Sequence, residues 1–249
     1  MTELGFVLIG IFLPLFPFSV VFNAVFERVG HPLARSALLL AWPQVGLWGL
    51  SAHTAEIPSW LVAWALASAV LYAFRLLAMR EMIRWTGFLA TSAWALLWLP
   101  AHAGGLPSQL WTFAAGFSVP LVFLTLLAQA LEHRFGAAYA GLYGGLAQRM
   151  PRLAGVLVVS LLAATATPLF PAFFGMLHAL VVSPPVPAVS LAGIWLIWSW
   201  AAARLLQGLI VGPADPGPEL DLRVGTTWLY TAGLAGLVLV GLAVTGSPL

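Results

Sequence analysis

The sequence lacks cysteine and lysine entirely, and it carries little charge of either sign. Without cysteine there is no disulfide, no thiolate metal site, no cysteine-ligated iron–sulfur cluster and no covalent cysteine catalysis. Only 7% of the 249 residues are charged, whereas a soluble domain has roughly 25%. So few charged side chains cannot cover a water-facing surface. The composition therefore excludes a soluble domain and predicts a membrane protein.

Apolar segments fill most of the chain, in which 61% of the residues are hydrophobic. A membrane helix needs roughly 20 apolar residues, so the chain has room for about eight helices and for no separate catalytic domain. No basic region precedes the first segment, so we expect it to be retained rather than cleaved as a signal peptide. We predict an all-α integral membrane protein with a single transmembrane domain over residues 1–249. The predicted spans are residues 4–26, 36–53, 58–79, 86–102, 107–131, 153–182, 187–211 and 226–246.

The ten basic residues are all arginine, and they lie in or beside alternate connections between the predicted spans. Cytoplasmic loops collect arginine in multi-pass membrane proteins, so these connections are expected on the cytoplasmic side. With eight spans, both termini then lie on the non-cytoplasmic side of the inner (cytoplasmic) membrane.

Proline pairs interrupt two of the predicted spans: Pro14 and Pro17 in the first, Pro168 and Pro171 in the sixth. A proline at membrane depth removes a backbone hydrogen bond, which neighbouring helices, hydroxyl groups or water must replace. Broken helices of this kind often mark transport sites. We therefore predict two broken helices and interpret them as the architecture of a transporter.

The twelve tryptophans lie mostly near the ends of the predicted spans, which is typical of an aromatic belt at the membrane interfaces. The sequence has no phosphate-binding glycine loop, no paired carboxylates, no metal-spaced histidine cluster and no nucleophile elbow. We therefore expect no enzymatic activity, no cofactor, no metal site and no nucleic-acid partner.

Several stretches, taken in chain order, resemble the antiporter-like membrane subunits of respiratory complex I, energy-converting hydrogenases and multi-subunit cation/proton antiporters. The most specific match is residues 144–151, Gly-Gly-Leu-Ala-Gln-Arg-Met-Pro, which is close to the family's Gly-Gly-Leu-x-x-Arg-Met-Pro loop. The other matching stretches are residues 17–19, 30–32, 36–39, 167–173 and 211–213. Full members have fourteen spans, and these motifs belong to the last eight. The resemblance thus implies a half-length antiporter-like fold without the first inverted repeat.

Members of this family move protons along a row of lysine, histidine and glutamate side chains inside the membrane. The corresponding positions of this chain carry apolar or neutral residues. These degenerate ion-path positions are Phe12, Ser19, Leu40, Gly46, Phe117, Leu121 and Met176. The absence of lysine from the whole chain does not depend on the alignment. The resemblance therefore implies that the fold is kept while the ion path is lost.

Four polar residues remain as candidates for a residual proton or coupling role. His178 lies two residues after Met176, which places it about 200° around the helix, on a different face. Glu132 and His133 end the fifth span, where a solvated or ion-paired helix end is the alternative interpretation. Arg204 is close enough to the expected cytoplasmic interface for its head group to snorkel there.

We expect a non-conducting accessory subunit of a larger ion-coupled membrane complex. Its expected partners are a full-length antiporter-like subunit, the lipid bilayer and, in some assemblies, a cytoplasmic subunit. The host complex would be of the complex I-like, cation-antiporter or inorganic-carbon uptake type. One alternative is an active proton- or cation-translocating subunit that uses His178 or residues supplied by a partner. A second alternative is a membrane enzyme acting on a lipid or a quinone, which would require a polar cluster inside the membrane.

Overall fold

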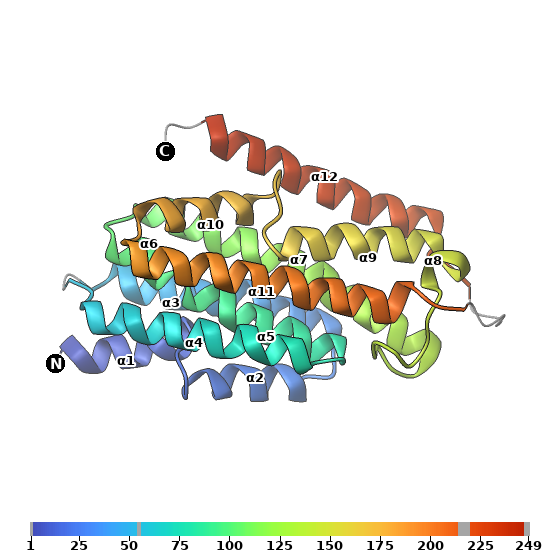
Figure 1. Ribbon diagram of the computed structural model, residues 1–249, viewed down its shortest axis with the longest axis horizontal. Helices are drawn as coiled ribbons and strands as arrows, with labels where there is room; N and C mark the ends of the chain where they lie inside the picture. The colour runs from blue at the N-terminus through green and yellow to red at the C-terminus, as the bar shows by residue number, and fades with distance from the viewer. Residues whose placement is uncertain (1, 54–55, 214–219, 247–249) are drawn as a thin grey trace.

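The computed structural model describes residues 2–53, 56–213 and 220–246. Within these residues the protein folds into twelve helices, most of which run along the long axis of the molecule (Figure 1). The helices are α1 (Thr2–Phe12), α2 (Ser19–Arg28), α3 (Pro32–Ser51), α4 (Ser59–Ala78), α5 (Met82–Ala95), α6 (Trp98–His102), α7 (Pro107–Phe135), α8 (Leu146–Arg149), α9 (Pro151–Ala164), α10 (Pro171–Val182), α11 (Pro185–Ile210) and α12 (Val224–Gly246).

The helices group into the eight predicted membrane segments. α3, α4, α7, α11 and α12 each occupy one segment, and the pairs α1–α2 and α9–α10 form the two predicted broken helices. Among the described residues, α4, α7, α11 and α12 are long and apolar enough to cross a membrane by themselves. The remaining segments are built from shorter pieces, and the four-residue α8 lies in the connection before α9. The predicted all-α membrane fold with two interrupted helices is therefore confirmed.

The fourth predicted span, residues 86–102, is not continuous, and its prediction as one helix was wrong. It is divided between α5 and α6, with a tight turn in which the N–H of Leu99 bonds to the carbonyl of Leu96 at 3.1 Å. Pro100 explains the turn, because proline has no N–H to donate and its ring clashes with the carbonyl four residues earlier, that of Leu96. The chain tightens locally into bonds of the 3₁₀ type.

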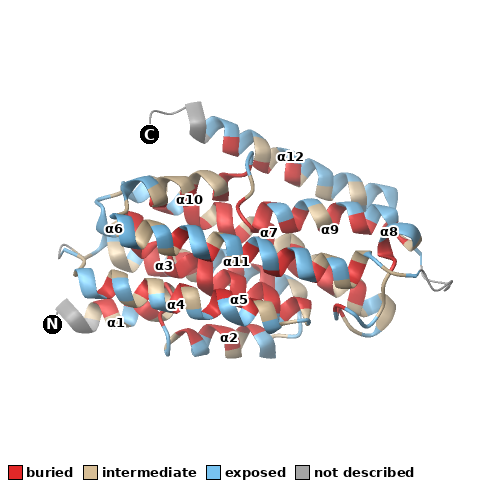
Figure 2. Ribbon diagram, in the orientation of Figure 1, coloured by how far each residue is buried: buried red, intermediate tan, exposed pale blue. Residues whose placement is uncertain are grey.

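α5 forms the centre of the bundle. Every residue of α5 except Arg84 is buried, and Figure 2 shows the buried residues concentrated in the middle of the molecule. α5 is buried because α2, α4 and α7 pack against it. α12 lies at the periphery, and most of its described side chains are exposed (Figure 2).

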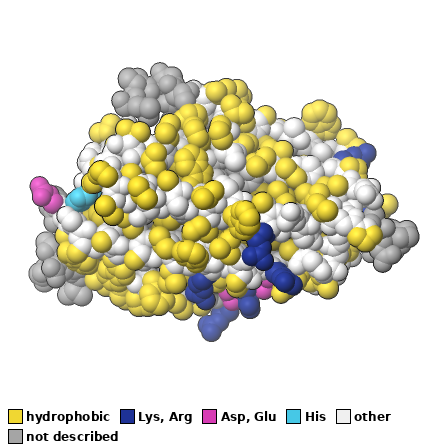
Figure 3. Space-filling view, viewed as in Figure 1, with side chains coloured by type: hydrophobic (Ala, Val, Ile, Leu, Met, Phe, Trp, Pro, Cys, Tyr) yellow, Lys and Arg dark blue, Asp and Glu magenta, His cyan; other side chains and the backbone are white. Residues whose placement is uncertain are grey.

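The arginines gather at the helix ends that meet at one end of the bundle, which we call the arginine end. At this end Arg84 pairs with Glu27 at 3.5 Å and with Glu81 at 3.1 Å. In Figure 3 no arginine side chain is visible at the opposite end, where an acidic side chain and a histidine are seen instead. The grouping of the arginines agrees with the sequence pattern, and the assignment of this end to the cytoplasm stays a prediction.

Candidate functional site at the two helix breaks

The first break, residues 13–18, separates α1 from α2 and leaves backbone carbonyls without helical donors. Inside a membrane an unpaired carbonyl costs several kcal/mol, so each needs a donor. Three tryptophan indoles from three other helices supply them. The pairs are Trp42 Nε1 with Ile11 O at 3.0 Å, Trp98 Nε1 with Leu13 O at 3.1 Å, and Trp64 Nε1 with Phe16 O at 2.6 Å.

The second break, residues 165–170, separates α9 from α10 and is closed in a similar way. The indole of Trp195 donates to the carbonyl of Thr165 at 3.0 Å, while the hydroxyl of Thr165 donates back to the carbonyl of Leu161 at 3.0 Å. Ala166 and Leu169 have φ values of 56° and 85°, which are unfavourable for residues with a Cβ and cost of order 1–3 kcal/mol each. The break is therefore a strained segment stabilised by its surroundings.

A glycine on a neighbouring helix allows close approach to each break. A Cβ added to Gly46 of α3 would lie 2.8 Å from Leu13 Cγ, and one added to Gly116 of α7 would lie 2.9 Å from Pro171 Cβ. Real Cβ atoms do not approach other atoms so closely. The packing of both breaks therefore depends on residues without a side chain.

A chain of neutral polar groups crosses the interior beside the first break. Ser19 and Tyr72 share a hydrogen bond of 2.8 Å between their hydroxyls. The amide nitrogen of Asn23 donates to the Ser19 carbonyl at 2.9 Å and to the Thr91 hydroxyl at 3.0 Å. These bonds connect α2 to α4 and α5, and they include no carboxylate, histidine or lysine.

Two further buried pairs join the central helices. The Trp198 indole donates to the Ser92 hydroxyl at 3.0 Å, and the Trp94 indole donates to the Ser118 hydroxyl at 3.1 Å. No aspartate, glutamate or histidine is buried among the described residues. The one buried charged side chain among them is Arg35, at the arginine end. The hydrogen bonds of the interior described above thus join neutral donors and acceptors, while Trp85 Nε1 and Ser160 Oγ are buried without a partner among the described residues.

The predicted ion-path positions are distributed unevenly. Phe117, Leu121 and Met176 are at most 3% exposed and belong to the apolar core, whereas Leu40 is 42% exposed on the surface of α3. Phe12 is half-buried, with its ring 5.2 Å from that of Trp42. Ser19 and Gly46 lie in the polar chain and against the first break, as described above.

The four candidate residual groups are not brought together. His178 is half-buried on α10, with its ring 5.6 Å from that of Phe113 near the start of α7. Glu132 lies about 28 Å further along α7 at 1.5 Å per residue. His133 is exposed and within 3.0 Å of Gln129. Arg204, also exposed, is on α11. A proton could not pass directly between His178 and Glu132.

The sequence did not indicate that tryptophan indoles would donate to the carbonyls of the two breaks. Five tryptophans are exposed, as a membrane-interface belt requires, but Trp85, Trp94, Trp98 and Trp198 are completely buried. The interpretation of most tryptophans as a belt was therefore wrong for these four and for those that bind the breaks. The position of Trp94 in the middle of a predicted span was the available signal, because a belt residue lies near a span end.

Burial affects one titratable group in the loops at the arginine end. Burial raises the pKa of Tyr143 to about 12, and the nearby Glu132 carboxylate contributes in the same direction. The Tyr143 ring stacks on Phe135 at 4.2 Å, and its hydroxyl donates to the carbonyl of Ala137 at 2.9 Å. Tyr143 therefore remains a neutral hydrogen-bond donor throughout the physiological pH range.

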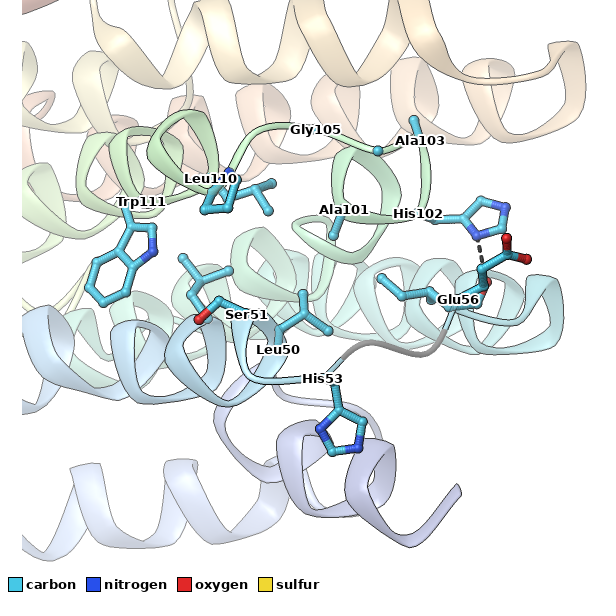
Figure 4. A pocket seen from close by; sticks show the side chains of 14 residues that line it. Leu50, Ser51, His53, Glu56, Ala101, His102, Ala103, Gly105, Leu110 and Trp111 are labelled. Atoms are coloured by element: carbon cyan, nitrogen blue, oxygen red, sulfur yellow. Dashed lines mark hydrogen bonds between the residues drawn. The ribbon is translucent and has the colours of Figure 1, made fainter. Parts of the chain in front are cut away.

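A cavity of about 690 Å³ lies at the end opposite the arginines. Figure 4 shows His102 at its edge, with Nδ1 2.7 Å from the carbonyl oxygen of Ile57, and His53 directed toward α1. The His53 ring packs beside Phe6 at 5.3 Å and against Gly5. Among the described residues that line the cavity, none belongs to either break. Its histidines therefore do not extend the polar chain of the interior.

The fold is similar to those of chains from solved membrane complexes. A chain of respiratory complex I from Thermus thermophilus matches with a TM-score of 0.82 and 22% identity, over 94% of this chain and 52% of that one. A chain of the Mrp complex from Dietzia sp. DQ12-45-1b matches with a TM-score of 0.77 and 12% identity, over 95% and 55%. A chain of the membrane-bound sulfane sulfur reductase, an archaeal respiratory membrane complex, matches with a TM-score of 0.76 and 15% identity, over 96% and 51%. No protein-family model and no curated protein matches this sequence.

The similarity extends over nearly all of this chain but only about half of each solved chain. The chain thus has the fold of about half of each of these membrane-complex chains. The resemblance and the half-length fold predicted from the sequence are confirmed.

Proposed function

We propose that this chain is a non-conducting, half-length antiporter-like component of a larger ion-coupled membrane complex of the complex I or Mrp type. The observation that carries this proposal is the chemistry of the two breaks, where tryptophan indoles and glycine contacts occupy the region in which the fold would hold an ion path. Proton transfer needs groups that gain and lose a proton near neutral pH. The buried hydroxyls, amide and indoles of this interior do not.

The proposed role is structural. A full-length antiporter-like subunit would supply the ion movement, and this chain would offer it a helical surface, since membrane helices associate through packing and hydrogen bonds. We further propose an inner-membrane location with both termini on the non-cytoplasmic side, because this places the arginine end in the cytoplasm. No catalytic activity is proposed.

Purification in mild detergent tests the structural role. We expect the tagged chain to co-purify with a longer antiporter-like subunit, identified by mass spectrometry. A monodisperse, partner-free chain from native membranes contradicts the proposal.

Proton flux into liposomes tests the absence of conduction. With the purified chain alone, and a membrane potential imposed, we expect the flux reported by an internal pH dye to equal that of protein-free liposomes. A full-length antiporter-like subunit serves as the positive control. A potential-driven flux above background contradicts non-conduction.

The alternative of an active subunit uses either His178, which is half-buried in the second half of α10, or residues supplied by a partner. In the intact complex, His178→Phe removes this group, and His31→Phe removes an exposed histidine as the matched control. We expect coupled transport to be the same in both variants. A loss restricted to His178→Phe supports the active alternative.

A further inference from the structure

A small cavity of about 260 Å³ lies at the arginine end, between the C-terminal parts of α4 and α11 and the loop that precedes α8. Its charged lining residues are Arg80 and Arg204, and no acidic side chain lines it among the described residues. The rest of the lining is apolar or glycine, including Leu76, Leu205 and Gly208. The cavity therefore combines two positive charges with an apolar wall.

Backbone contacts hold the cavity in shape. The N–H of Ala140 donates to the carbonyl of Arg80 at 2.8 Å, and the N–H of Gly141 donates to the carbonyl of Gly208 at 2.8 Å. A Cβ added to Gly208 would lie 2.9 Å from that of Ala140, so the loop approaches α11 this closely only because residue 208 has no side chain. The loop is thus fixed to both walls of the cavity.

The two guanidinium groups have no anionic partner in the part of the chain that is described. Neither forms an ion pair or a hydrogen bond there, and the acid next to Arg80 in sequence, Glu81, pairs instead with Arg84 at 3.1 Å. Some of the other arginines at this end do have acceptors: Arg134, for example, donates to the Leu220 carbonyl at 2.9 Å. Two unpaired positive charges at one cavity favour an anion.

The surface beside the cavity indicates what kind of anion. Leu196, Trp200, Arg204 and Gly208 follow one another at intervals of four on α11, so they lie along one face of the helix. Leu196 and Trp200 are 70% and 63% exposed. This face runs from the arginine toward the middle of the membrane as an uncovered apolar strip, which suits acyl chains.

We infer that this cavity binds the phosphate of an anionic phospholipid, with its acyl chains along the Leu196 and Trp200 face of α11. Arginine forms bidentate hydrogen bonds with phosphate oxygens, and basic pockets between membrane helices on the cytoplasmic side suit anionic head groups. The site is independent of whether the chain conducts ions.

Native mass spectrometry of the delipidated protein in detergent tests the site, with phosphatidylglycerol as the probe. The variant Arg80→Gln/Arg204→Gln removes both charges of the cavity. The variant Arg28→Gln/Arg223→Gln removes two exposed arginines elsewhere at the same end and is matched in net charge. We expect the affinity for phosphatidylglycerol to fall about 30-fold in the first variant and to stay near that of the wild type in the second. If the double variant does not fold, the single variants Arg80→Gln and Arg204→Gln replace it. Each is expected to lose an intermediate part of the affinity for phosphatidylglycerol.

Two competitors separate the possible sources of the phosphate. We expect that neither zwitterionic phosphatidylcholine nor inorganic phosphate displaces phosphatidylglycerol. Displacement by inorganic phosphate at comparable concentration identifies a soluble phosphate ligand and overturns the lipid assignment. Equal losses in the two double variants, or equal binding of phosphatidylcholine, show general surface attraction and overturn the site itself.

Discussion

The indole nitrogen of Trp98 donates a hydrogen bond to the carbonyl oxygen of Leu13 at 3.1 Å, across 85 residues of sequence. Both residues are completely buried, so removal of the donor leaves the carbonyl unpaired. An unpaired buried acceptor costs about 1–3 kcal/mol. We therefore expect Trp98→Phe to lower the free energy of unfolding in detergent by at least about that amount. The matched control is Trp228→Phe at an exposed position, and equal stability of the two variants would disprove the role of the bond.

The close contact at Gly46 gives a second prediction. In Gly46→Ala the new methyl group would meet Leu13 at 2.8 Å, and overpacking of this kind costs about 1–3 kcal/mol. Gly193→Ala, on α11, places its methyl group where no atom lies within 4 Å, so it should be neutral or stabilising by up to about 1 kcal/mol. Thermal unfolding of both variants in the same detergent measures the difference. A Gly46→Ala variant as stable as Gly193→Ala would show that the first break can move aside.

A third prediction concerns pH and Tyr143. Its pKa is raised from 10.0 to about 12 in the folded protein, so the folded state holds this proton more tightly than the unfolded state does. The resulting stability is fully present below the unfolded pKa of 10 and is lost as the pH rises from about 10 to about 12. We expect the unfolding temperature to fall over this range and to fall less steeply in Tyr143→Phe.

Tyr139→Phe is the control for this measurement, because it changes an exposed tyrosine in the same loop. Its slope against pH should match the wild type. Identical slopes for wild type and Tyr143→Phe would mean that burial of the Tyr143 hydroxyl does not contribute.

The connection before α12 gives a fourth prediction. The Asp221 carboxylate accepts hydrogen bonds from the N–H groups of Arg152 at 2.9 Å and Leu153 at 3.1 Å, at the start of α9. Loss of such a helix cap costs about 1 kcal/mol. We expect Asp221→Ala to lower the unfolding temperature and to expose this connection to limited proteolysis. Glu56→Ala, which removes one exposed acid at the other end, should change neither.

The sequence predicted the order of the membrane segments and both helix breaks, because hydropathy and proline act locally. Pro14 and Pro168 each remove a backbone N–H, although Pro43 and Pro120 lie inside the continuous helices α3 and α7. The sequence did not predict that the fourth span is divided at Leu96. Pro100 lies near the end of that span, and whether a proline there bends or divides a helix depends on the packing around it.

The candidate site was predicted only in part. The family resemblance placed neutral residues at the ion-path positions, and Phe117 is indeed inside the core, but Leu40 lies on the surface. The indole donors could not be predicted, because Trp98 and Leu13 meet only in the folded bundle. A single sequence gives the number of tryptophan indoles and of carbonyls that the prolines leave without a helical partner. It does not give which indole reaches which carbonyl.

The short central helix has a consequence for how this protein is made. With 14 residues, α5 is about 21 Å long, less than the roughly 30 Å of a bilayer's hydrocarbon layer. The hydroxyls of Thr86 and Thr91 bond to carbonyls of α5 itself, and that of Ser92 bonds to the Ala69 carbonyl of α4 at 2.8 Å. The length of α5 does not suit residence in lipid alone, so during synthesis its surroundings are complete only after α7, which follows it in the chain, has packed against it.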